Sequence, residues 1–151
     1  MLKYTIFSLL LVSCNFTEKG KIRKNDINQS DVSVNSNDTL IKYDIEGIST
    51  EGTEAEVRYV NGKIAKSTTS VYGETGQANI IYEFDSDRIK VLETKYSYLT
   101  GLANLKSDKD IKLEYKISYS IDLKGHLIGK EIPARIDIFN EFKNTVPFEL
   151  K

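Results

Sequence analysis

The stretch IKLEYKISYSIDL, residues 111–123, decides the fold. Its seven odd-numbered residues are aliphatic or aromatic, and the six residues between them are polar or charged. A period of two is typical of a β-strand with one buried face and one wet face. A strand of 13 residues would extend about 43 Å, and an exposed edge of that length invites aggregation. We therefore expect this strand to lie inside a twisted sheet.

The same alternation precedes the long strand, in shorter segments that are separated by turn signals. These segments cover residues 40–46, 54–60, 64–72, 78–84 and 89–98. Asn61-Gly62 is the strongest turn signal, because both central residues of a type I′ turn need positive φ. The resulting hairpin places Tyr59 opposite Ile64. In the last segment the apolar residues change parity, and a bulge or bend near Leu92 would account for the change.

The C-terminal region predicts one short helix. Lys124-Gly125 closes a further hairpin, Pro133 suits a first helical turn, and Ile136, Phe139 and Phe142 recur at helical spacing. These features predict a helix over Ala134–Asn144, with a strand through Arg135–Phe139 as the competing interpretation. We expect a mainly β (α+β) fold, an antiparallel, twisted meander sheet of about six or seven strands with a short C-terminal helix packed on one face.

The N-terminus has the features of a secretion signal. Lys3 is followed by an apolar run at residues 5–12, which is too short to cross a bilayer as a helix, since that takes roughly 20 residues. We therefore interpret residues 1–13 as a removable signal peptide.

Leu11-Val12-Ser13-Cys14 resembles the lipobox of bacterial lipoproteins. The resemblance implies that the chain is cut before Cys14, that Cys14 carries a thioether-linked diacylglycerol, and that its new α-amine is acylated, with palmitate as the expected chain. Two or three acyl chains would hold the protein at a membrane. The alternative is an ordinary secretory signal that ends in an unmodified Cys14.

A polar segment separates the lipobox from the alternating region. Residues 14–39 hold the lipidated Cys and a tether rich in Asn, Ser, Asp, Thr and Lys, which has too few apolar residues to form a core. Residues 40–151 are then a single β-rich globular domain. Asp38-Thr39-Leu40 also resembles an acceptor motif for O-glycosylation of exported proteins, which makes Thr39 a candidate site. Otherwise Asp38 and Thr39 simply begin the first strand.

The whole pattern resembles small lipoproteins of Gram-negative bacteria, a group without an established activity. The resemblance consists of the lipobox, the polar tether, the YGETG turn at residues 72–76 and the KGHLI hairpin at residues 124–128 before the C-terminal helix. It implies a lipid-anchored envelope protein, at the outer membrane and facing the periplasm.

Composition argues against several classes of function. The chain has 21 Lys and Arg against 22 Asp and Glu, with one His and one Cys. The near-neutral charge argues against nucleic-acid binding, and the single His and Cys argue against common zinc sites and His-containing triads. We expect a monomer with no cofactor, no metal site and no catalytic residues.

Two functions fit these constraints. The first is a non-catalytic, membrane-anchored binding or structural module, which has an envelope protein as a candidate partner. Its candidate binding surface comprises aromatic residues near strand ends, one charged turn residue and one residue of the long strand's polar face, namely Tyr72, Glu74, Tyr96, Tyr98 and Lys116. The alternative is a periplasmic inhibitor of an envelope-acting hydrolase that inserts the loop Asn104–Asp110 into an active site.

Overall fold

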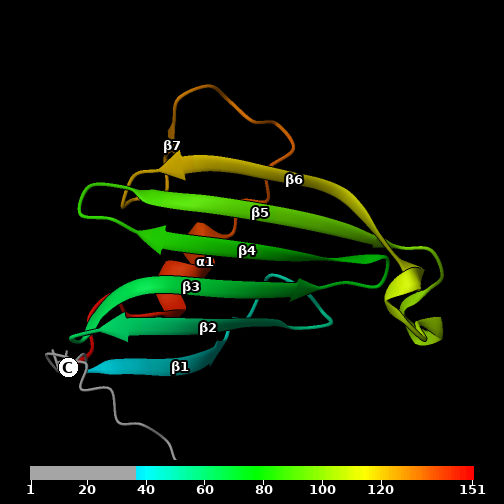
Figure 1. The fold of residues 1–151 in the computed structure, drawn as a ribbon, viewed down its shortest axis with the longest axis horizontal. Coiled ribbons are helices and arrows are strands. Elements are labelled where there is room, and N and C mark those ends of the chain that lie inside the picture. The colour runs from blue at the N-terminus through cyan, green and yellow to red at the C-terminus, as the bar shows by residue number, and fades with distance from the viewer. Residues whose placement is uncertain (1–36) are drawn as a thin grey trace, which may run out of the picture. The chain divides into compact units, whose positions relative to one another are not determined.

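The computed structural model describes residues 37–151, which form a seven-stranded antiparallel sheet (Figure 1). The strands pair in chain order, as β1 (Asp38–Asp44), β2 (Thr53–Val60), β3 (Lys63–Tyr72), β4 (Gly76–Phe84), β5 (Ile89–Tyr98), β6 (Ile111–Ile121) and β7 (Leu127–Ile128). Two short 3-10 turns, Leu102–Asn104 and Asp108–Asp110, interrupt the β5–β6 connection, and one helix, α1 (Phe139–Thr145), follows the sheet. The predicted mainly β meander with a C-terminal helix is confirmed.

The β2–β3 hairpin has the predicted turn and register. Asn61 and Gly62 have φ values of 52° and 76°, as a type I′ turn requires. Tyr59 lies opposite Ile64.

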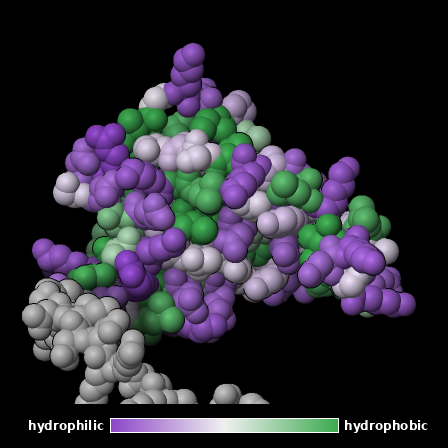
Figure 2. Space-filling model, in the orientation of Figure 1, coloured by the Kyte–Doolittle hydropathy of each residue, from purple (hydrophilic) through white to green (hydrophobic). Residues whose placement is uncertain are grey.

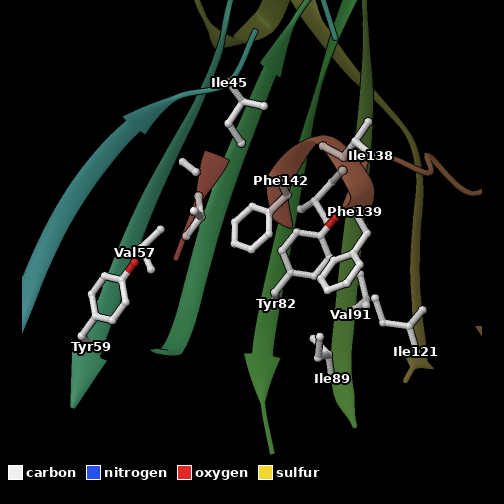
Figure 3. Close-up of a cluster of buried hydrophobic side chains, with 13 residues drawn as sticks. Ile45, Val57, Tyr59, Tyr82, Ile89, Val91, Ile121, Ile138, Phe139 and Phe142 are labelled. Atoms are coloured by element: carbon white, nitrogen blue, oxygen red, sulfur yellow. The ribbon is translucent and has the colours of Figure 1, made fainter. Parts of the chain in front are cut away.

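One face of the sheet packs against α1, and this layer is the core. Alternating residues of β2, β4 and β5 are buried there, including Val57, Ile80 and Val91. The rings of Phe139 and Phe142 in α1 lie with their centroids 5.5 and 5.0 Å from that of Tyr82 (Figure 3). Aromatic pairs at such distances add to the free energy gained by burial. The opposite side of the sheet, called the open face below, has no helix over it among residues 37–151.

The helix is shorter than predicted. It begins at Phe139, and the preceding residues form neither a helix nor the competing strand. The backbone N–H of Ile136 is bound to the side chain of Glu93 on β5, and the carbonyl of Ala134 lies 2.9 Å from the hydroxyl of Tyr115 on β6. Because the sheet contacts these backbone groups, residues 134–136 lie outside the helix, which begins only at Phe139.

The expectation that the long strand lies inside the sheet is wrong for most of its length. β6 spans 11 residues and pairs with β5 at all of them except Glu114, but it pairs with β7 only at Ser120 and Ile121. Charged side chains and bulges are the usual protection of such an edge. β6 has both, since Lys112 and Lys116 are exposed and its pairing with β5 is irregular next to Glu114.

The same irregularity replaces the bend predicted near Leu92. Lys95 pairs with Tyr115 and Tyr96 pairs with Leu113, so Glu114 is an extra residue on β6. Up to Lys95, the odd-numbered residues of β5 face the core. Since residues paired across strands share a face, the bulge moves Leu113 onto the open face beside Tyr96.

At Gly76, the first residue of β4, the backbones of β4 and β5 approach each other closely, and a substitution there tests this approach. A Cβ atom at this position would collide with the backbone carbonyl oxygen of Tyr96 on β5. We expect Gly76→Ala to lower the free energy of unfolding by about 1–3 kcal/mol through this overpacking, measured by urea denaturation. Gly101→Ala is the control, because nothing lies within 4 Å of its added methyl group. Equal stability of the two variants would contradict the close approach.

Candidate functional site

Three of the predicted tyrosines lie together on the open face. A cross-strand row runs Tyr72, Gln77, Tyr96 and Leu113, from β3 to β6. Tyr98 lies on the same face two residues beyond Tyr96 and pairs with Ile111. We call the five residues Tyr72, Gln77, Tyr96, Tyr98 and Leu113 the tyrosine face.

The tyrosine face combines exposed apolar surface with polar groups. Tyr72 is 42% exposed and Leu113 is 52% exposed, while Tyr96 and Tyr98 are half-buried. The hydroxyl of Tyr98 donates to Oε1 of Gln77 across 3.4 Å. Partial burial, and secondarily the nearby Tyr72, raise the pKa of Tyr98. Figure 2 shows hydrophilic, pale and hydrophobic side chains mixed over the surface, including the end from which the β5–β6 connection projects.

A second row on the open face lies next to the first and is polar. It runs Ser70, Asn79, Thr94 and Lys116. Oδ1 of Asn79 is buried and has no hydrogen-bond partner within residues 37–151. No carboxylate of the same residues lies within 4.0 Å of the Lys116 ammonium. Lys116 therefore contributes a positive charge beside the tyrosine face.

The remaining predicted residues lie at varying distances from this surface. Glu74 is exposed in the turn that joins Tyr72 to Gly76, at the end of the sheet where the tyrosine face lies. Thr39 lies in β1, at the far side of the sheet order, where Asp38 and Thr39 begin the strand. Cys14, like residues 1–13, lies outside the described residues.

Sequence reasoning missed Gln77 and Leu113. Gln77 is a polar residue in an alternating strand, and only the register with β3 and β5 places it between two tyrosines. Leu113 belongs to the apolar set of residues 111–123, which was expected to face the core. Its exposure follows from the extra residue at Glu114.

A second polar cluster is buried on the core face and was not predicted. Glu93 of β5 is fully buried, and its carboxylate accepts hydrogen bonds from the hydroxyls of Tyr115 and Tyr119, at 2.7 and 3.0 Å. The backbone N–H of Ile136 lies 3.0 and 3.1 Å from the two carboxylate oxygens. The cluster therefore ties the chain before α1 to β5 and β6.

Neutral donors surround the Glu93 carboxylate. Burial, and then the hydrogen bond to Glu93, raise the pKa of the Tyr115 hydroxyl. Burial and the charge of Glu93 likewise raise the pKa of Tyr119, and Arg135 partly opposes this rise. The tyrosines therefore remain protonated donors. Because the carboxylate is buried and already bound by three groups, the cluster serves the structure and offers no accessible catalytic group.

The Glu93 cluster can be tested by substitution. Glu93→Ala leaves the Tyr119 hydroxyl and the Ile136 N–H without their acceptor and removes one of the two acceptors near the Tyr115 hydroxyl, so we expect it to lower the free energy of unfolding by about 2–5 kcal/mol. Glu93→Gln keeps one carbonyl acceptor and should cost about 1–3 kcal/mol. Urea denaturation followed by circular dichroism measures both.

The control for this series is Glu83→Gln on the open face. Glu83 is largely exposed and pairs with Lys66 at 3.3 Å, so its substitution should change stability by no more than about 0.5 kcal/mol. A loss at Glu93 no larger than the loss at Glu83 would contradict the role given to the buried cluster.

His126 has a structural partner in the β6–β7 turn. The Asp122 carboxylate accepts hydrogen bonds from the backbone N–H groups of His126 and Lys124, at 2.9 and 2.8 Å, and lies 3.0 Å from Nδ1 of His126. These hydrogen bonds, with those from His126 the largest, lower the pKa of Asp122 to about 2. The pair is exposed and holds the turn, as turn chemistry of this kind predicts.

The β5–β6 connection is held by its own hydrogen bonds. Oδ2 of Asp110 accepts the backbone N–H groups of Lys106 and Ser107, at 2.9 and 3.0 Å, and the N–H of Leu99 donates to the Asp110 carbonyl. Almost all of its side chains are exposed. The segment that the inhibitor hypothesis invokes, Asn104–Asp110, is therefore an ordered projection from the end of the sheet.

Within residues 37–151 there is no group of three or more His, Cys, Asp or Glu side chains arranged to hold a metal ion. The part of the chain that the structure describes also has no helix of the length and apolarity needed to cross a membrane.

Comparisons with known proteins found no similar protein. No family model matches the chain, and neither the curated proteins nor the solved structures contain a match.

Proposed function

We propose that this protein is a lipid-anchored, non-catalytic binding module of the bacterial envelope and that the tyrosine face is its binding surface. In this proposal Cys14 carries the anchor, at the outer membrane and on the periplasmic side. Residues 14–37 connect the anchor to the sheet, and the domain acts as a monomer without a cofactor.

The tyrosine face is the observation on which the proposal depends. α1 fills the core face, while three tyrosines and a leucine gather at one end of the open face. Tyrosine is enriched at binding interfaces because it combines apolar area with a hydroxyl and has few rotatable bonds. A row of such residues on the open face, which no helix of residues 37–151 covers, supports a recognition role more strongly than a role in packing.

The anchor is supported by the lipobox resemblance of residues 11–14. Cys14→Ser should release the full-length protein from the membrane fraction or leave its precursor uncut, because the acceptor of the diacylglycerol is lost. Fractionation followed by immunoblotting measures this. Normal processing with unchanged membrane retention would contradict the lipoprotein proposal.

The binding surface is tested by capture of envelope components on the detergent-solubilised full-length protein. The variant Tyr72→Ala/Tyr96→Ala should lose the components that the natural chain retains, because two exposed rings are removed from one row. Glu56→Ala is the control, since Glu56 is exposed on the open face of β2, far in strand order from β5. Retention by all three proteins would contradict the assignment of the surface.

A hydrolase inhibitor is the second candidate, and the ordered β5–β6 connection favours it. Inhibitory loops that are already held in one conformation lose less conformational entropy on binding. Inhibition of an envelope hydrolase that is lost on Asp110→Ala, with the tyrosine double variant still active, would favour this candidate over the binding module.

A further inference from the structure

The tyrosine face has a spacing that suits a polymer of sugars. Tyr72 and Tyr96 lie in one cross-strand row, and only β4 separates their strands. Neighbouring strands are 4.7–4.9 Å apart, so the two tyrosines start about 10 Å from each other. This is close to the disaccharide repeat of an extended β-linked glycan. Two rings in such a row can therefore contact alternate sugars of one strand.

The chemistry between the two rings also fits a sugar. A pyranose ring has an apolar face of C–H groups that packs on an aromatic ring, and hydroxyl groups around its rim that need hydrogen-bond partners. Gln77 lies between Tyr72 and Tyr96, and its amide can both donate and accept. The hydroxyls of Ser70 and Thr94 follow in the second row. Rings and polar groups thus alternate across the surface.

Charge indicates which kind of glycan fits. Four other basic side chains of the open face have acidic partners within 4.0 Å, in the pairs Lys42–Glu54, Arg58–Asp38, Lys66–Glu83 and Lys90–Asp85. Lys116 has no such partner among the described residues, and it lies in the row next to Tyr96. An anionic ligand would supply the missing partner, and a carboxylate is a common partner for an ammonium group.

We propose that the tyrosine face binds an extended glycan strand that carries carboxylates, with alternate sugars on Tyr72 and Tyr96 and a carboxylate beside Lys116. This inference rests on the proposed function, because it names the ligand of the same surface. The row crosses the sheet at right angles to the strands, and no helix of residues 37–151 covers it. A polymer bound along the row can therefore continue past both ends of the site.

The experiment uses peptidoglycan glycan strands freed of their stem peptides, which carry a carboxylate on alternate sugars. A matched probe is the same material after methyl esterification of these carboxylates. Isothermal titration calorimetry with the detergent-solubilised full-length protein should show tighter binding of the charged strands. Tyr96→Ala should weaken binding of both probes by about tenfold or more, while Tyr96→Phe, which keeps the ring, should bind both.

Lys116→Ala separates charge from stacking. It should abolish the preference for the charged strands and leave the affinity for the esterified strands unchanged. Glu56→Ala should bind both probes as the natural chain does. Circular dichroism of each variant shows whether a loss reflects unfolding, and a Tyr96→Ala variant that unfolds is replaced by Tyr72→Ala, whose side chain is more exposed.

The experiments distinguish a wrong ligand from a wrong binding surface. If neither glycan binds while envelope capture still depends on Tyr72 and Tyr96, the glycan proposal is overturned and the binding module stands, with a protein as its partner. Equal binding of charged and esterified strands would overturn the carboxylate assignment. If the tyrosine variants change neither capture nor glycan binding, both proposals are wrong.

Discussion

The packing of Phe139 and Phe142 against Tyr82 determines how the rest of this domain is organised. It selects one face of a seven-stranded sheet as the core, and the C-terminal segment crosses that face from β6 to the β2–β3 hairpin. Each end of the crossing is held by tyrosine hydroxyls. Tyr115 and Tyr119 bind Glu93 beside Ile136, and the hydroxyl of Tyr59 donates to the carbonyl of Pro147 at 2.8 Å. The backbone N–H of Ile64 then donates to the Phe148 carbonyl.

Because α1 covers one face, the other face has no helix over it among residues 37–151. A helix of seven residues covers only one side of a sheet, so exposed side chains of the open face must be compatible with water. Many are paired charges or hydroxyls, as Lys66–Glu83 and Ser70 illustrate. The tyrosine face differs, because it groups three tyrosines with an exposed leucine beside Lys116, which has no acidic partner within 4.0 Å among residues 37–151. That local departure from a solvated surface is the reason to place recognition there.

Residue alternation and turn chemistry predicted most of the fold. The hairpin at Asn61-Gly62, the strand order and the presence of a C-terminal helix needed only local patterns. Two features depend on long-range contacts and could not be predicted. Glu93 is a charged residue at a strand position that faces the core. Its burial is tolerated because its carboxylate accepts hydrogen bonds from Tyr115, Tyr119 and Ile136, which are distant in the sequence. The extra residue at Glu114 places the Leu113 side chain on the open face instead of the core face. No local pattern in residues 111–123 indicates this bulge. Tyr72, Tyr96 and Tyr98 were predicted from their positions near strand ends, whereas Gln77 required the register.

The division of the sheet into a core face and an open face can be measured directly by hydroxyl-radical footprinting of the native full-length protein, read by mass spectrometry. Tyr72 on the open face is 42% exposed and Tyr82 on the core face is 2% exposed. We expect rapid modification of Tyr72 and protection of Tyr82 until the protein is unfolded in urea. Modification of the two residues at similar rates in the folded protein would contradict the assignment of the faces, and with it the binding surface.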